Sequence, residues 1–285
     1  MASVENIALF ISLVGVVLTL VFTLVAFIQR RRAATGQRGA IQTTEPRIRS
    51  GAWDFVATAL AVGTLLSVTL TITSRAIETG HAPFSNMYEF AVAFAWGILA
   101  IGMVFRWRYK IGAIQNIGSM VALLLLIFAR VQFSKPASLV PALQQSALLS
   151  AHVASAMVAY GALTIGFGAA LLFLIQNRRK SPWLPDPDVL DNISYRSVIL
   201  GFPFLTLLIV LGALWADIAW GRYWSWDPKE TASLVTWLIY AGYLHARVMR
   251  GWRGTRAAIF LSAGFAAILL TFFGNYVFTG LHAYG

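Results

Sequence analysis

Eight long apolar runs, separated by short polar segments, organise the 285 residues of this chain. Each run is close to the roughly 20 apolar residues that a helix needs to cross the hydrocarbon core of a bilayer. The pattern therefore predicts an all-α polytopic membrane protein with about eight transmembrane helices. The expected spans are 7–29, 53–73, 88–105, 111–131, 148–176, 197–219, 228–249 and 257–279.

Basic residues give these helices an orientation. Seventeen of the 22 lysines and arginines lie in the segments 30–49, 106–110, 178–196 and 247–256, which the helix order places on one side of the membrane. Positive charge marks the cytoplasmic side, so both termini are expected on the outer, periplasmic or lumenal, side. The net charge of +11 thus follows the loops of one membrane side, and this argues against a nucleic-acid partner.

Composition also suggests how the chain divides. Residues 1–50 would form a first transmembrane helix and a cytoplasmic linker, and residues 51–285 a seven-helix domain. No basic segment precedes the first apolar run and no small-residue cleavage site follows it, so we interpret it as a retained helix. The inner segment 181–192 holds three prolines and three aspartates and is expected to be irregular. Asp227, Pro228 and Glu230, in contrast, fit the capping position and the first and third positions of a helix.

The stretch from Trp215 to Glu230, WADIAWGRYWSWDPKE, holds four tryptophans between two apolar runs. Indole rings favour the membrane surface, because the ring is apolar and its N–H is polar, so one interpretation is an aromatic anchor. Four rings in one loop favour a second interpretation, a platform for a flat apolar ligand such as a porphyrin or quinone. The candidate residues of this platform are Trp215, Trp220, Gly221, Arg222, Tyr223, Trp224, Trp226 and Asp227.

Four histidines are the candidate metal ligands of a chain that contains no cysteine. His81, His152 and His282 fall at the outer level, where two neutral imidazoles across a planar ring would make a bis-histidine haem site. His245 lies about 26 Å along its helix from Pro228, in the inner half of the membrane, where an ionisable group is a functional candidate. As a haem ligand it would need a mate from another subunit. A zinc site is the competing interpretation, but the expected ligand spacings are missing.

The segment WGRYWSWDPKE (220–230) resembles the tryptophan-rich WWD motif of haem-handling proteins in cytochrome c maturation. It is most similar to the CcsA (ResC) family of subunits of the System II cytochrome c synthase. Four other segments resemble the same family, and together they cover most of the chain from about Gly80. They are GHAPFSNMYEF (80–90), HVASAMVAYGAL (152–163), YLHAR (243–247) and FTGLHAYG (278–285).

The resemblance implies that haem b is both substrate and bound ligand of residues 51–285. His152 and His282 would hold it at the WWD platform, and His245 would be a transmembrane histidine on the route from the inner side. The mate of His245 would belong to a companion subunit of the CcsB (ResB) type, and His81 would be structural. Trp220, Trp224 and Trp226 would bracket the macrocycle. Arg222 would pair with a propionate or remain a solvated charge, and Asp227 would cap its helix or orient the loop.

The same resemblance implies a holocytochrome c synthase, or haem lyase, that acts with its companion and is inactive alone. An apocytochrome c would bring a reduced Cys-x-x-Cys-His segment whose thiols add to the haem vinyl groups, while His152, His282, Trp220, Trp224, Trp226 and Asp227 provide the orientation. Thiol-disulfide reductants would be further partners, and a bacterial plasma membrane is favoured over a thylakoid membrane. Three alternatives stay open: a haem exporter or chaperone, a bis-histidine electron-transfer cytochrome, and a structural subunit anchored by its tryptophans.

Overall fold

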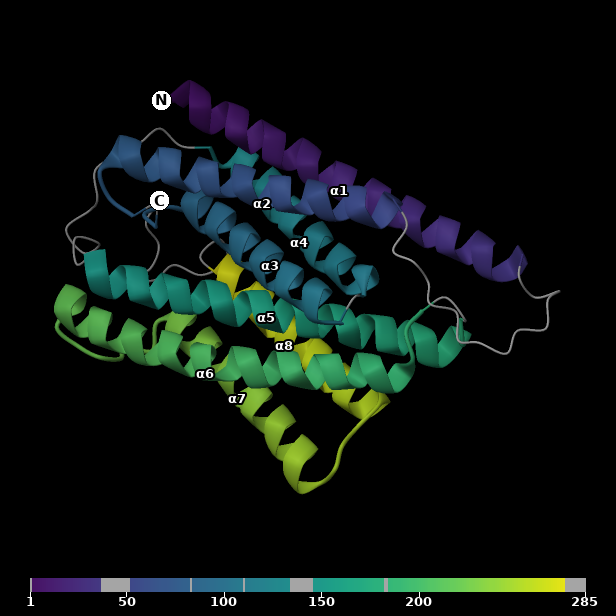
Figure 1. The fold of residues 1–285 in the computed structure, drawn as a ribbon. Coiled ribbons are helices and arrows are strands. Elements are labelled where there is room, and N and C mark those ends of the chain that lie inside the picture. Colours follow the sequence, from purple (N-terminus) through teal and green to yellow (C-terminus); the bar gives the residue numbers. More distant parts are fainter. Residues whose placement is uncertain are drawn as a thin grey trace.

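The computed structural model describes residues 2–36, 52–82, 84–109, 111–133, 146–181 and 184–274, and all regular elements within them are helices. Most of the helices run side by side along one long axis, and α7 is inclined to it (Figure 1). They are α1 (Ala2–Gly36), α2 (Ala52–Thr79), α3 (Met87–Tyr109), α4 (Gly112–Val131), α5 (Ser146–Arg179), α6 (Pro187–Trp220), α7 (Pro228–Met249) and α8 (Thr255–Phe273).

Seven of these helices are long and apolar enough to cross a membrane, which confirms the prediction of a polytopic membrane protein. Helix α7 is not among these seven, and its sequence includes the polar residues Lys229, Glu230, His245 and Arg247. Its 22 residues correspond to about 33 Å of helix, which still matches the thickness of a bilayer core. The composition of α7, and not its length, therefore separates it from the other helices.

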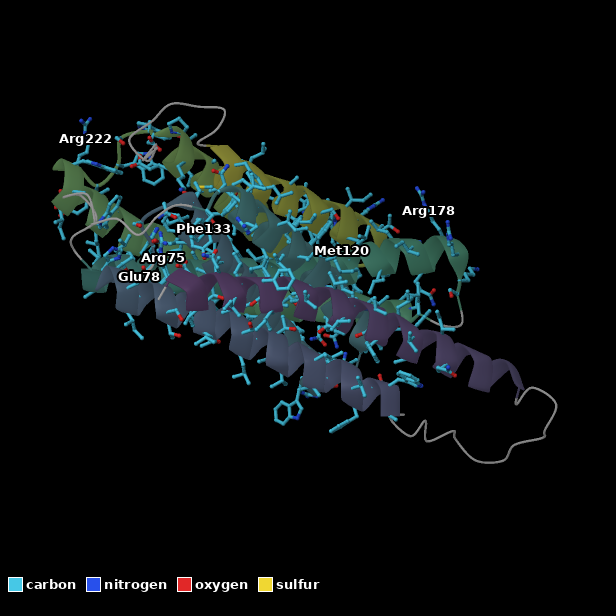
Figure 2. All side chains as sticks on the ribbon, turned by 90° about the horizontal axis from the view of Figure 1, so that it is seen from above. Arg75, Glu78, Met120, Phe133, Arg178 and Arg222 are labelled. Carbon is cyan, nitrogen blue, oxygen red and sulfur yellow. The ribbon has the colours of Figure 1, made fainter. Side chains whose placement is uncertain are left out.

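The two ends of the bundle differ in what they carry. The start of α1, the end of α2, the start of α3, the end of α6 and the start of α7 gather at one end, on the left of Figure 1. Arg222 lies at this end and Arg178 at the opposite one (Figure 2). We call the first the outer end and the second the inner end, following the orientation that the basic segments predict.

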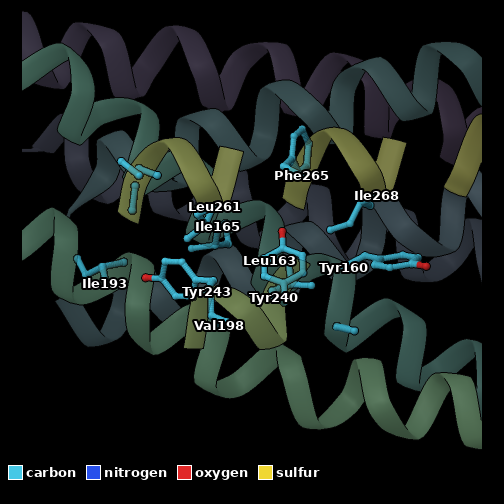
Figure 3. Packing of buried hydrophobic residues seen from close by; sticks show 14 of the residues in the cluster. Tyr160, Leu163, Ile165, Ile193, Val198, Tyr240, Tyr243, Leu261, Phe265 and Ile268 are labelled. Atoms are coloured by element: carbon cyan, nitrogen blue, oxygen red, sulfur yellow. The ribbon is translucent and has the colours of Figure 1, made fainter. Parts of the chain in front are cut away.

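Helix α5 is the centre of the fold, because it packs against α3, α4, α6 and α8. The largest hydrophobic core lies between α5, α6, α7 and α8, where Leu163, Tyr240 and Leu261 are fully buried (Figure 3). Glycines bring α3 and α5 close together: a Cβ on Gly161 would lie 2.8 Å from the Gly97 carbonyl oxygen. This close approach fixes the outer half of α5, which carries His152, against the rest of the bundle.

A second hydrophobic core lies between helices α1, α2, α3 and α4, and a buried ionic network lies at its outer end. The Arg75 guanidinium, 1% exposed, donates from Nε to the Glu89 carboxylate at 2.8 Å and lies 3.6 Å from the Glu5 carboxylate. The Tyr88 hydroxyl donates to Glu5 at 2.7 Å. Breaking such a buried network by removing one partner is strongly destabilising. The network thus fastens the first helix to α2 and to the start of α3.

The expectation that 181–192 is irregular is wrong from Pro187 onward, because α6 begins there. Asp186 caps the helix by accepting a hydrogen bond from the Asp188 backbone N–H at 2.9 Å, and Pro187 occupies the first turn. Proline suits this position because its missing N–H would have no partner within the helix. Helix α7 begins with the same Asp-Pro pair, Asp227 and Pro228, so the same helix-start pattern occurs at two places in the sequence.

Candidate functional site

A large cavity opens at the outer end, where the ends of five helices meet the 221–227 loop. The space between its atoms, including open solvent at the mouth, is about 1200 Å³. Most of its wall is apolar, with Phe90, Phe94 and Phe272 on one side, and its polar lining includes His152 and Lys229. The walls come from α3, α5, α6, α7 and α8, so the cavity depends on the complete bundle.

His152 is the histidine that the structure places in this cavity. Its Nδ1 lies 2.9 Å from the backbone carbonyl oxygen of Leu208 on α6. A carbonyl only accepts, so Nδ1 carries the proton in this contact and the lone pair of the neutral ring is at Nε2. Metal-ligating histidines commonly use one ring nitrogen in this way to fix the tautomer and the orientation of the other. His152 is therefore held in the form that can ligate iron.

Gly212, one turn after Leu208, makes room for the imidazole. A Cβ at this position would lie 2.8 Å from Cε1 and 3.1 Å from Nδ1 of His152, and real Cβ contacts are essentially never shorter than 3.0 Å. The ring therefore lies against bare helix backbone and can reach the Leu208 carbonyl. Sequence reasoning missed Gly212, because a glycine within an apolar helix has no feature that marks it as part of a site.

The four tryptophans do not form one surface. Trp215 and Trp220 belong to the last turns of α6 and pack edge to face, with ring centroids 4.7 Å apart, against the start of α5. Trp224 and Trp226 form a second edge-to-face pair in the loop, with centroids 5.9 Å apart. Trp215 and Trp224 line the cavity, together with Tyr223, whereas Trp220 and Trp226 lie outside its wall.

The loop between α6 and α7 holds two residues in the left-handed region of backbone space. Gly221 (φ 72°) ends α6, and its N–H bonds to the Asp217 carbonyl at 2.8 Å. Trp226 has φ 60°, which costs roughly 1–2 kcal/mol for a residue with a Cβ. Its side chain is 70% exposed. Strain of this kind often accompanies functional loops, and here it leaves a large indole on the surface beside the cavity mouth.

The capping box predicted at the start of α7 is present. The Asp227 carboxylate accepts from the Lys229 backbone N–H at 2.9 Å, and the Glu230 carboxylate accepts from the Asp227 backbone N–H at 3.2 Å. Glu230 also accepts from the Ser225 backbone N–H at 2.8 Å. Glu230 thereby ties the loop to α7, and both carboxylates are buried. These contacts give Asp227 the role of a helix cap.

Lys229 is a cation that the sequence did not single out. It lies in the first turn of α7, outside the seven candidate spans, and its Nζ is 5.6 Å from the centre of the Phe90 ring in the cavity wall. Burial lowers the pKa of Lys229 to about 8, and the Asp227 carboxylate opposes this shift only in part. A hydrogen bond to Asp217 raises the pKa of the nearby Tyr223 phenol. Among the described residues of its lining, the cavity thus offers one ammonium group, and the charge of this group responds to pH.

The other candidate residues lie away from the cavity. Arg222 is exposed on the loop, directed away from the bundle (Figure 2). His81 lies between α2 and α3, with its Nδ1 2.9 Å from the Ala82 carbonyl oxygen. His245 is exposed near the inner end of α7. His282 lies outside the described residues.

A family model described as "Cytochrome C assembly protein" matches residues 84–282, a range that includes the whole lining of the cavity. The chain is 37% identical over 248 residues to the cytochrome c biogenesis protein CcsA of Guillardia theta, covering 77% of this chain and 82% of the relative. It is 40% identical over 238 residues to CcsA of Chlamydomonas reinhardtii, covering 79% and 67%.

Among solved structures, the cytochrome c heme lyase CcmF is similar to this chain, with a TM-score of 0.67. The two sequences are 18% identical, so this likeness concerns the fold alone. The superposition covers 95% of this chain and 46% of CcmF, and the chain therefore spans about half the length of that protein.

Proposed function

The chain belongs to the cytochrome c assembly protein family, in the branch of the CcsA proteins, and we propose that it binds haem at its outer end and presents it for thioether attachment to apocytochrome c. It is an integral membrane protein of cytochrome c biogenesis. The proposed reaction is that of a haem lyase, carried out together with a CcsB-type companion subunit. The observation that carries the proposal is His152, held in one tautomer in the wall of a large apolar cavity.

The cavity suits haem as a substrate in three respects. Its apolar wall of phenylalanines matches the macrocycle, and Trp215 and Trp224 add indole surface. The Nε2 lone pair of His152 is a haem ligand of the usual kind. Lys229 supplies a positive charge for a propionate, a role that we assign to it in preference to Arg222, because only Lys229 lines the cavity. We propose His282 as the second axial ligand.

Presentation to the apocytochrome depends on the loop. A reduced Cys-x-x-Cys-His segment would approach the cavity mouth, where the exposed Trp226 offers an apolar contact. Each thiol adds across a vinyl double bond, so that sulfur bonds to the inner carbon and the proton ends on the terminal carbon. The contribution of this chain is orientation: it holds the vinyl edge of its substrate toward the incoming thiols and keeps the rest of the ring buried.

The position of His245 supports a role for the companion subunit. Its imidazole is exposed on α7, at the inner end and on the outside of the bundle, whereas His152 lines a cavity at the other end. A haem bound to His245 would therefore lie against the lipid or against another protein. We propose that the companion subunit supplies the opposite ligand there, and that this chain alone does not complete the reaction.

The absorption spectrum of the detergent-purified protein, co-produced with its companion, tests the haem assignment. Oxidised and dithionite-reduced spectra should show a low-spin haem. His152→Ala, His282→Ala and His245→Ala should weaken this signal, and His81→Ala should leave it unchanged. A colourless wild-type protein under haem-replete conditions would refute the proposal and leave the tryptophans as membrane anchors.

A second measurement separates a haem lyase from a haem exporter or chaperone. A reporter apocytochrome with one Cys-x-x-Cys-His segment is produced with the complex and then analysed for haem that survives denaturing electrophoresis. Covalent haem on the reporter supports the lyase. Haem bound to the complex without any covalent haem on the reporter supports the exporter or chaperone.

A further inference from the structure

A groove at the inner end of the bundle is separate from the haem cavity. It lies between α3 and α6, and the space between its atoms, including open solvent at its mouth, is about 840 Å³. No residue of this groove belongs to the cavity at the outer end. Its lining is Val104, Phe105, Arg108 and Tyr109 from α3 and Asn192, Tyr195, Arg196, Ile199 and Leu200 from α6.

Both walls of the groove change from polar to apolar in the same direction. Helix α3 runs toward the inner end and passes its apolar pair, Val104 and Phe105, before Arg108 and Tyr109. Helix α6 runs away from the inner end and passes its polar residues, Asn192 to Arg196, before Ile199 and Leu200. The spacing of three and four residues keeps each set on one helix face. The groove is thus cationic and phenolic at the inner end and apolar toward the middle of the bundle.

Arg108 and Arg196, the two arginines of this groove, have no carboxylate partner among the described residues. Two other arginines at the inner end, Arg106 and Arg247, are held by nearby side chains. Arg106, on another face of α3, donates to the Gln115 side-chain oxygen at 3.0 Å and to Thr58 Oγ1 at 2.8 Å. Arg247 holds the nearby carboxylate of Asp191 at 2.9 and 2.5 Å.

Arg108, in contrast, lies over the Tyr109 ring at 5.5 Å, and Arg196 uses its Nε for the Asn192 side-chain oxygen at 3.1 Å. Both side chains are exposed. Their charges face the groove without a counter-ion from the described part of the chain, so an anion would find two guanidinium groups there.

We propose that this groove binds an anionic phospholipid of the inner leaflet, with the phosphate at Arg108 and Arg196 and the first acyl carbons along the apolar walls. Guanidinium groups match phosphate oxygens, and cations at the cytoplasmic surface attract anionic lipids. Val104 and Ile199 are 54% and 47% exposed, so the deep end is open to acyl chains from the side. The excess of positive charge on the cytoplasmic side explains why arginines occur at the inner end of the bundle. It does not explain why they lie in a groove whose two walls both change from polar to apolar.

Native mass spectrometry of the full chain in mild detergent tests this site with phosphatidylglycerol and phosphatidylcholine as probes. Wild-type protein should retain one saturable phosphatidylglycerol adduct and bind phosphatidylcholine much more weakly. Arg108→Gln combined with Arg196→Gln should weaken that adduct about thirtyfold, since each cation near the surface contributes roughly a factor of five. The matched control is Arg250→Gln with Arg253→Gln, which removes the same charge from exposed residues outside the groove and should change little.

A second variant tests the apolar half without changing charge. Val104→Trp fills the deep end at an exposed position, so it should leave the fold intact and still weaken the lipid adduct. Equal weakening by the two arginine pairs, or equal binding of the two lipids, would overturn the proposal. Displacement of the lipid by inorganic phosphate at equal concentration would also overturn it, because the acyl chains would then contribute nothing. None of these outcomes depends on haem binding at the outer end.

Discussion

Gly212→Ala is a small change that tests whether His152 is held as an iron ligand. The substitution adds one methyl group to α6 and alters no charge and no hydrogen-bonding group. The new Cβ would lie 2.8 Å from Cε1 and 3.1 Å from Nδ1 of the imidazole. The ring lies between α6 and the cavity that it lines, so it must rotate or α5 and α6 must separate. Either movement lengthens the 2.9 Å contact between Nδ1 and the Leu208 carbonyl.

The expected size of the effect follows from two comparisons. Inserting a methyl group into a well-packed interior typically costs about 1–3 kcal/mol. Losing the group that orients a metal-ligating histidine typically lowers metal affinity about 10- to 100-fold. We therefore expect Gly212→Ala to weaken haem binding by about one to two orders of magnitude while the protein remains folded.

The assay is a haem titration of the detergent-solubilised complex, followed by the low-spin absorption bands of the reduced state. The control is Gly63→Ala in α2, where nothing lies within 4 Å of the added Cβ. This control measures the general effect of replacing a helical glycine with alanine. Circular dichroism of both variants establishes that the helical content is unchanged.

A double-mutant cycle makes the test specific. If Gly212 acts only through the imidazole, Gly212→Ala should have little further effect in a His152→Ala background, and the two single changes should be non-additive. Wild-type haem affinity in a folded Gly212→Ala variant would refute the reasoning, because His152 would then not ligate haem in the orientation that Leu208 fixes. Full additivity would show that Gly212 acts on the site by another route.

Three further predictions concern other parts of the site and the fold. Asp227→Ala should lower the free energy of unfolding by about 1 kcal/mol, while Asp227→Asn should retain both stability and haem binding if Asp227 acts only as a helix cap; thermal unfolding and haem titration measure the two effects. A bound propionate should favour the charged form of Lys229, whose pKa is about 8, so the contribution of Lys229 to haem affinity should be constant below this pH and fall as the pH rises above it. Lys229→Gln should remove that dependence, and an unchanged pH profile would contradict the role in propionate binding. Arg247→Leu should lower the free energy of unfolding by roughly 1–3 kcal/mol, because the half-buried Asp191 carboxylate then keeps, among the described residues, only the Gly254 backbone N–H as a partner, and the combined Arg247→Leu and Asp191→Leu change should cost less.

Much of the fold could be predicted from the sequence, because hydrophobic runs, basic segments and helix caps are local signals. The start of α7 at Pro228 was predicted to the residue, since Asp227 and Glu230 form a capping box whose side chains and backbone N–H groups all lie within four consecutive residues. The start of α6 was missed by about ten residues, although Asp186 and Pro187 have the same pattern. Three prolines in one segment suggested irregular structure, but one of them occupies a position that favours helix formation.

The candidate site was harder to predict, because its geometry depends on contacts between helices. The sequence predicted that His152 and the tryptophan-rich stretch belong to the same membrane level, and the structure places His152, Trp215 and Trp224 around one cavity. It could not show that the Leu208 carbonyl orients the imidazole or that Gly212 gives it space. Lys229 could not be identified as a cavity residue from the sequence for the same reason, since it lies near Phe90 only because α3 and α7 are close together in the fold.

The division of labour among the tryptophans follows from where α6 ends. Gly221 terminates the helix between the second and third indoles, so Trp215 and Trp220 pack with the helix side chains, while Trp224 and Trp226 extend from the loop. A motif that looks uniform in the sequence is therefore split between holding α6 against α5 and shaping the cavity mouth. Each pair contributes one ring to the cavity wall, Trp215 from the helix and Trp224 from the loop, and Trp226 of the second pair is exposed. Substitution of Trp215 or Trp224 should therefore lower haem affinity, whereas substitution of the exposed Trp226 should affect apocytochrome recognition, although all three lie within twelve residues of one chain segment.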